Sequence, residues 1–136
     1  MSHLRTLAAI ALLCASPALS RGAGITGTYC GAVLSSGEMT DVVTRFVQES
    51  DGKISGSYKF MDGKIPVTGA LVSRSAPGAV QVDFLWQDKF GSGRVVISPA
   101  ADWNSFTGKW GSNADLPRYD WYGKRCADKA EPGVAS

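Results

Sequence analysis

The sequence predicts an all-β protein, an eight-stranded antiparallel up-and-down β-barrel closed by a disulfide between its first and last strands. Three observations predict this fold: a five-residue pattern that recurs four times, turn-forming residues at short intervals, and two cysteines near the ends of the predicted domain. No segment combines a sustained helical period with helix caps, so helices are not expected.

The recurring pattern is a large apolar residue, Ser or Thr, Gly, any residue, and a second large apolar residue. It occurs at residues 25–29, 54–58, 67–71 and 106–110. In a strand, alternate side chains point to opposite faces, so the glycine shares a face with both apolar groups. Glycine between bulky residues suits a strongly bent strand, and the pattern therefore predicts a curled sheet or a barrel.

Residues 1–20 have the layout of a secretory signal peptide. Arg5 supplies positive charge, residues 7–13 are an apolar run, and Ala18 and Ser20 are the small residues before a cut after Ser20. The apolar run is too short to span a membrane. We therefore expect export to the bacterial periplasm or the extracellular space, with no membrane span.

The predicted cut removes His3, which is the only histidine, and Cys14. A lipid anchor on Cys14 is the alternative to soluble export, but bulky Leu13 precedes this cysteine where lipoprotein signals carry a small residue. Without imidazole, the mature chain lacks Ser–His and Cys–His nucleophile pairs and His-based metal sites. We expect no enzyme activity, no catalytic residues, no metal site and no cofactor.

The charge balance argues against a nucleic-acid partner. The chain has 14 Lys and Arg against 12 Asp and Glu, and the basic residues form no run.

Residues 21–126 are the predicted barrel domain. Residues 127–136 have too little apolar surface to fold and are predicted to be a flexible C-terminal tail.

Turn signals separate the predicted strands, because Gly, Pro, Asp and Asn favour the backbone conformations of tight turns. They lie at Asp51-Gly52, Asp62-Gly63, Pro77-Gly78, Gly91-Ser92-Gly93, 102–104 and 113–117. The eight predicted strands between them are 24–33, 40–49, 53–61, 64–73, 79–87, 93–98, 105–111 and 118–126.

Each predicted strand has its own sequence pattern. The first, third, fourth and seventh each contain one copy of the repeat, and the second has adjacent valines, Val42 and Val43, on both faces. The fifth alternates, with Val80 and Trp86 on the same apolar face. The sixth and eighth occupy the stretches between the remaining turns.

Two cysteines decide between an open sheet and a closed one. Cys30 lies in the first strand and Cys126 ends the eighth, and an exported domain with two cysteines usually bonds them. A disulfide requires Cα atoms within about 7 Å, so these two strands must be neighbours. In an up-and-down meander this happens only when the sheet closes, which also removes both exposed edges.

The first strand has Gly27-x-Tyr29, the third has Gly56-x-Tyr58, and the last carries an inward Arg125. In these features the chain resembles the calycin barrels, the lipocalin- and avidin-like superfamily. The resemblance implies that Arg125 packs across Tyr29.

A longer series of motifs extends the resemblance over nearly all of residues 24–126. The motifs are Gly-x-Tyr at 56–58, Trp-x-Asp at 86–88, Phe-x-Gly-x-Trp-Gly at 106–111 and Trp-x-Gly-x-Arg at 121–125. In their order the chain resembles a broad set of uncharacterised exported bacterial β-barrel proteins. Biotin binding is not expected, because Gly31 and Phe60 stand where the avidin pattern has polar residues.

The candidate ligand-binding residues are aromatic. Tyr29, Tyr58, Trp86, Trp110 and Trp121 share the glycine face, which closure turns inward. The alternative is that these rings fill the lumen as core, since eight strands enclose little more than their own side chains. A void of more than about 300 Å³ would favour a ligand.

Trp103 is the sixth candidate, and it lies in the turn of residues 102–104. It either anchors a ligand or partner, or folds back as a lid over the barrel end.

The sequence therefore predicts a binding module for a small apolar or aromatic ligand. The alternative is a protein-binding barrel, such as an inhibitor of a secreted or envelope hydrolase, that acts through Trp103 and the turn at 113–117. The oligomeric state is left open.

Overall fold

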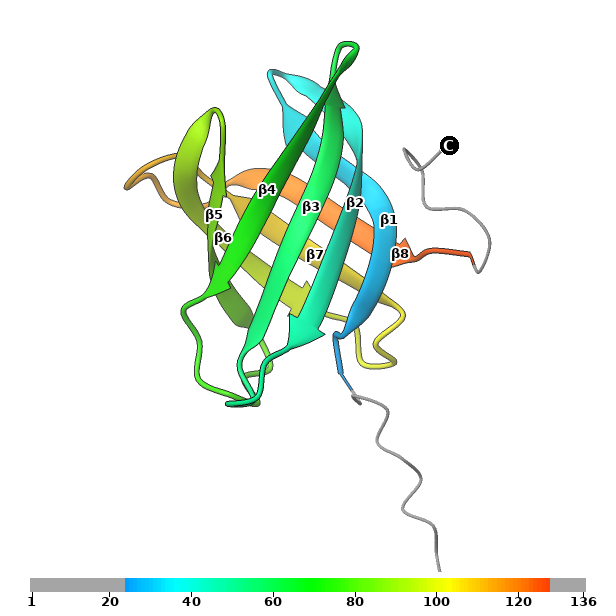
Figure 1. The fold of residues 1–136 in the computed structure, drawn as a ribbon, viewed down its shortest axis with the longest axis vertical. Coiled ribbons are helices and arrows are strands. Elements are labelled where there is room, and N and C mark those ends of the chain that lie inside the picture. The colour runs from blue at the N-terminus through cyan, green and yellow to red at the C-terminus, as the bar shows by residue number, and fades with distance from the viewer. Residues whose placement is uncertain (1–23, 128–136) are drawn as a thin grey trace, which may run out of the picture.

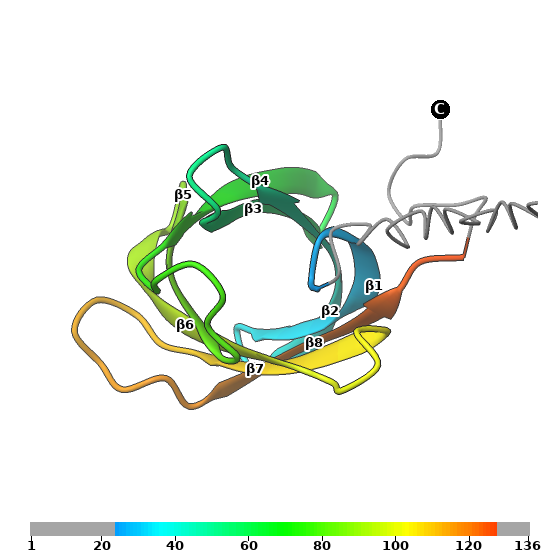
Figure 2. The ribbon, with the colours of Figure 1, turned by 90° about the horizontal axis from the view of Figure 1, so that it is seen from below.

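The computed structural model describes residues 24–127, which form a closed antiparallel β-barrel (Figures 1 and 2). The predicted signal peptide, 1–20, and residues 128–136 of the predicted tail lie outside the described residues. The strands are β1 (Gly27–Ser35), β2 (Glu38–Gln48), β3 (Ile54–Asp62), β4 (Ile65–Ser73), β5 (Val82–Asp88), β6 (Gly91–Pro99), β7 (Ser105–Trp110) and β8 (Tyr119–Arg125). The predicted all-β, eight-stranded barrel is confirmed.

The barrel closes where β1 pairs with β8, in a register that sets Tyr29 opposite Arg125. Cys30 and Cys126 form the predicted disulfide, with their Cα atoms 5.0 Å apart. Cys126 lies one residue beyond the end of β8, where its backbone N–H donates to the carbonyl oxygen of Thr28 at 3.1 Å. The cross-link therefore ties β1 to the segment that directly follows β8.

The lumen is filled over most of its length by inward side chains that alternate with outward ones along each strand. The buried apolar core residues are Ile25, Tyr29, Val33, Val42, Phe46, Tyr58, Phe60, Val67, Leu71, Val82, Phe84, Trp86, Val95, Ile97, Phe106 and Trp121. Thr44 is the buried polar side chain among the described residues. Burial of these rings and aliphatic groups supplies the main driving force for folding.

At two glycines of the repeat, the absence of a Cβ leaves space for side chains of the neighbouring strands. Tyr58 pairs with Gly69 across β3 and β4, and a Cβ at Gly69 would lie 2.0 Å from the tyrosine ring. A Cβ at Gly56 would similarly crowd Phe46 and Leu71 at 3.2 and 3.1 Å. The repeat thus lets large residues of one strand lie directly on the backbone of the next.

The start of β5 and the position of the β5–β6 turn differ from the prediction. The fifth strand begins at Val82 rather than at 79, and Val80 is 82% exposed instead of sharing the buried face of Trp86. The turn predicted at Gly91-Ser92-Gly93 is wrong, because Gly91 already begins β6. The turn is formed by the two residues that precede Gly91.

The turn between β1 and β2 is tighter than expected. Ser36 and Gly37 have φ values of 52° and 80°, the left-handed conformation typical of a two-residue hairpin turn. Both strands consequently extend beyond their predicted ends and carry Ser35 and Glu38 to the end of the barrel.

Candidate functional site

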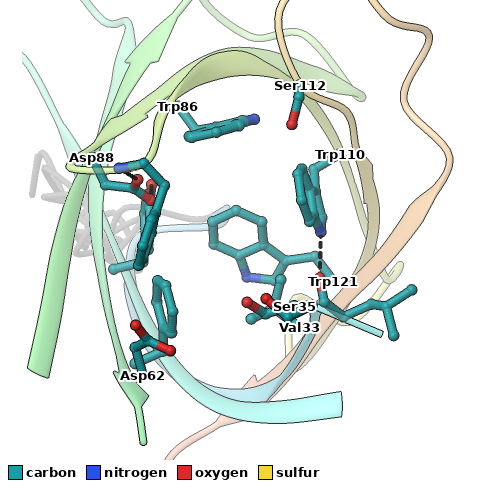
Figure 3. Close-up of a pocket in the computed structure, with 13 residues that line it drawn as sticks. Val33, Ser35, Asp62, Trp86, Asp88, Trp110, Ser112 and Trp121 are labelled. Atoms are coloured by element: carbon teal, nitrogen blue, oxygen red, sulfur yellow. Dashed lines mark hydrogen bonds between the residues drawn. The ribbon is translucent and has the colours of Figure 1, made fainter. Parts of the chain in front are cut away.

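One end of the barrel is hollow. A cavity of about 310 Å³ opens among the β1–β2, β3–β4 and β5–β6 turns and the segment that follows β7 (Figure 3). It is lined by Val33, Leu34, Ser35, Ser36, Tyr58, Phe60, Asp62, Trp86, Asp88, Phe90, Trp110, Ser112 and Trp121. These residues come from both halves of the sheet, so the cavity depends on closure of the barrel.

The walls and floor of the cavity are aromatic. Trp121, 3% exposed, lies at the centre of the view in Figure 3, with Trp86 and Trp110 beside it. The Trp86 and Trp110 rings meet edge to face at 5.6 Å, and Tyr58 meets Trp121 in the same way at 4.8 Å. Edge-to-face contacts of this kind are favourable because the positive edge of one ring faces the negative face of another.

The three indole rings are held in place by hydrogen bonds. Trp86 Nε1 donates to the Gly111 carbonyl oxygen at 2.9 Å, and Trp110 Nε1 donates to the Leu34 carbonyl oxygen at 3.1 Å. Trp121 Nε1 donates to Thr44 Oγ1 at 3.0 Å, which explains why an inward threonine is present in an otherwise apolar core. The cavity walls are therefore preorganised, and their N–H groups already have acceptors.

Tyr58 and Asp88 form a polar pair at the cavity wall. The tyrosine hydroxyl donates to Asp88 Oδ2 at 2.6 Å, and Asp88 Oδ1 accepts from the Phe90 backbone N–H at 2.8 Å. Burial, followed by the hydrogen bond and the charge of Asp88, raises the pKa of Tyr58. The tyrosine therefore stays protonated and acts as a hydrogen-bond donor to the carboxylate.

The rim of the cavity combines acidic and aromatic groups. Asp62 lies at the mouth on the same side as Asp88 (Figure 3). Phe90 is 58% exposed in the β5–β6 turn, and Lys89 Nζ lies 5.0 Å from the centre of its ring. Serine hydroxyls complete the polar lining of the mouth.

Tyr29 and Trp103 are outside this cavity. Tyr29 is 1% exposed and packs edge-on against Phe46 and Phe106, with centroid distances of 5.7 and 5.2 Å. Its hydroxyl donates to the Trp103 carbonyl oxygen at 3.1 Å. Trp103, with φ of 61°, is half-buried, packs against the core and lines a smaller hollow of about 200 Å³ at the opposite end. This placement matches the lid alternative.

The structure thus brings four of the six candidate ligand residues, Tyr58, Trp86, Trp110 and Trp121, into one cavity. Phe60 and Asp88 are not among the six candidates, yet both line it. Strand alternation could have found them, since each lies two residues after a candidate, Tyr58 or Trp86, and so shares its face. Asp62, the last residue of β3, continues the same alternation two residues after Phe60, whereas Ser112 lies beyond the end of β7, where alternation gives no signal.

No known protein family has a model that matches this chain, and no match was found among curated proteins. Within residues 24–127, no helix is long and apolar enough to cross a membrane. The same residues contain no cluster of three or more His, Cys, Asp or Glu side chains placed to hold a metal ion. The function must therefore be argued from the cavity itself.

Proposed function

We propose that this protein is a binding module and that the cavity takes up a small apolar or aromatic molecule. The single observation that carries this proposal is an open hollow of about 310 Å³ at one end of an interior that is filled by side chains over most of its length. Small-molecule sites have volumes of about 300–1,000 Å³ and are mostly apolar with a few polar groups. The cavity lies at the lower end of this range, which corresponds to a compact ligand.

The aromatic walls support an apolar or aromatic ligand in particular. An aromatic ring that packed against the cavity-facing sides of Trp86 and Trp110 would replace water with ring contacts, each worth about 0.5–1.5 kcal/mol beyond the area that it buries. The indoles are held in position before the ligand arrives, so little conformational freedom is lost on binding. A fixed, partly apolar hollow of this kind favours binding.

Binding rather than catalysis, and function outside the cytoplasm, are parts of the same proposal. The disulfide between Cys30 and Cys126 supports an oxidising compartment and leaves neither cysteine available as a nucleophile. The raised pKa of Tyr58 makes this hydroxyl a poor general base. The Tyr58–Asp88 pair is better suited to shaping the wall than to transferring protons.

A protein-binding barrel that acts through its turns is the second candidate. Trp103 lends it little support, because this side chain is half-buried against the core. The turn at 113–117 supports it through Leu116, which is 76% exposed. We expect a Leu116→Ser variant to lose any inhibition of a panel of secreted glycosidases and proteases, and unchanged activity of every enzyme with the wild-type protein would contradict this candidate.

The ligand proposal is tested with a neutral fluorescent probe, N-phenyl-1-naphthylamine, and with thermal unfolding. We expect saturable binding to the wild-type protein and affinity reduced about tenfold in Trp110→Ala, which removes one wall of the cavity. Tyr122→Ala is the matched control, because Tyr122 lies on the outer surface of β8 and is half-exposed. The absence of saturable binding by this probe and by small aromatic competitors would contradict the proposal.

A further inference from the structure

The polar groups of the cavity are unequally divided between hydrogen-bond donors and acceptors. The indole N–H groups of Trp86, Trp110 and Trp121 all donate to protein oxygens. The Tyr58 hydroxyl donates to Asp88. Among the side chains that line the cavity, only serine hydroxyls are left as donors, whereas the carboxylates offer several acceptor sites.

The charged side chains that line the cavity are all negative. Its lining contains two carboxylates, Asp62 and Asp88, and no Lys or Arg. The two oxygens of Asp88 each accept one hydrogen bond, which leaves capacity for more, since a carboxylate accepts about four. Within residues 24–127, Asp62 has no ion-pair partner.

Aromatic ring faces add to this preference. The face of an indole or phenol ring carries negative potential and attracts cations, most strongly where water is partly excluded. The protein already shows this contact at the rim, where Lys89 Nζ lies over the Phe90 ring at 5.0 Å. Ring faces and carboxylates therefore favour the same kind of ligand.

We propose that the ligand of this cavity is a small organic cation: a protonated or quaternary amine carried on an apolar or aromatic body. This inference rests on the proposed binding function and names its ligand class. The apolar body contacts the walls formed by Trp86 and Trp110, and the ammonium group lies toward Asp62 and Asp88. Anionic ligands are disfavoured because the cavity lining offers them two carboxylates and few donors, and the Lys89 ammonium at the rim already lies over the Phe90 ring.

The test uses three probes with similar phenyl bodies: phenethylamine, 2-phenylethanol and 3-phenylpropionate, which are cationic, neutral and anionic at pH 7. Displacement of N-phenyl-1-naphthylamine gives the affinity of each. We expect the amine to bind about tenfold more tightly than the alcohol and the carboxylate to bind most weakly. The advantage of the amine should shrink in about 1 M salt, where charges are screened beyond about 3 Å.

Variants locate the charge that is responsible. In the double variant Asp62→Asn/Asp88→Asn, the amine should bind no better than the alcohol. The amide oxygen of asparagine at position 88 can still accept from the Tyr58 hydroxyl, at the expense of the bond that Asp88 accepts from the Phe90 backbone N–H. Asp102→Asn is the matched control: it removes one negative charge at the opposite end, from a turn where Asp102 accepts the Asn104 N–H.

The outcomes separate this inference from the proposed function. If the alcohol or the carboxylate binds as tightly as the amine, the cation preference is wrong and the binding function stands. An amine advantage that persists in the double Asn variant also overturns the inference. If neither the naphthylamine nor any of the three probes binds to the wild-type protein, both proposals fall.

Discussion

The guanidinium carbon of Arg125 lies 5.0 Å from the centre of the Tyr29 ring, and its terminal nitrogens donate to the carbonyl oxygens of Thr26 and Gly24 at 2.9 and 3.0 Å. One side chain thus joins the end of β8 to the start of β1 and to the segment before it. A Cβ at Gly27 would lie 2.4 Å from Arg125 Nη1, so the glycine leaves room for the guanidinium.

Replacement of Arg125 should loosen this closure. We expect Arg125→Lys to lower the free energy of unfolding by about 1 kcal/mol, because an ammonium group cannot form the same planar fork to two carbonyl oxygens. Urea unfolding measures the loss. Arg118→Lys is the matched control. Arg118 lies between β7 and β8 and also packs over a tyrosine ring, so this variant measures the effect of replacing arginine by lysine at such a contact. Equal stability of Arg125→Lys and wild type would show that the fork contributes nothing.

Gly69→Ala should destabilise the barrel by about 1–3 kcal/mol, since the added methyl group overlaps the Tyr58 ring. The measurement is a double-mutant cycle in urea. If the contact with Tyr58 is the cause, the cost of Gly69→Ala should shrink strongly in a Tyr58→Ala background. An undiminished cost in that background would place the strain in the backbone of β4 instead.

Removal of the disulfide should cost about 2–5 kcal/mol of unfolding free energy, since the bond joins residues 96 positions apart and restricts the unfolded chain. The comparison is between Cys30→Ala/Cys126→Ala and the oxidised wild type. Addition of a reductant should lower the stability of the wild type toward that of the variant and leave the variant unchanged. A reductant effect of the same size on both proteins would contradict this account.

Alkaline pH should weaken the fold through Tyr58. Its pKa is raised above the ordinary 10.0 by burial and by Asp88, so above that pH the unfolded state releases a proton that the folded state keeps. Stability from this group is complete below pH 10.0 and is lost as the pH rises further, with a slope of up to about 1.4 kcal/mol per pH unit.

The check on this prediction compares wild type and Tyr58→Phe in urea between neutral and strongly alkaline pH. The variant lacks the ionisable hydroxyl, so its stability should fall less steeply above pH 10.0 than that of the wild type. Tyr29 contributes in the same direction, because its pKa is also raised by burial, an effect partly offset by Arg125. Parallel curves for the two proteins would show that Tyr58 is not responsible.

The barrel could be predicted from the sequence because the determinants of its strands are local and its closure follows from one pair of cysteines. The repeat, the alternation and the two cysteines fix the strands and their closure. The turn predicted at Gly91-Ser92-Gly93 is misplaced because glycine serves in strands as well as in turns. A Cβ at Gly93 would lie 2.0 Å from the Gly111 carbonyl oxygen, so this glycine provides for a close approach inside the sheet.

The cavity was less predictable, because a void depends on which rings meet across the lumen. Alternation places Tyr58, Trp86 and Trp121 on the inward face but does not reveal whether they fill the space between them. The positions of the indole rings depend on the hydrogen bonds that Trp121 and Trp86 donate to Thr44 and Gly111, which lie far from them in the sequence. Val80 illustrates the same limit: it continues the apolar alternation of β5 but lies outside the paired strand.

Three of the four tryptophans line the open end, and Trp103 is the fourth. A Trp103→Phe protein would therefore emit indole fluorescence only from rings beside the cavity. The emission wavelength and fluorescence lifetime of such a protein would report occupancy of the cavity without an added dye, for ligands of any chemical class.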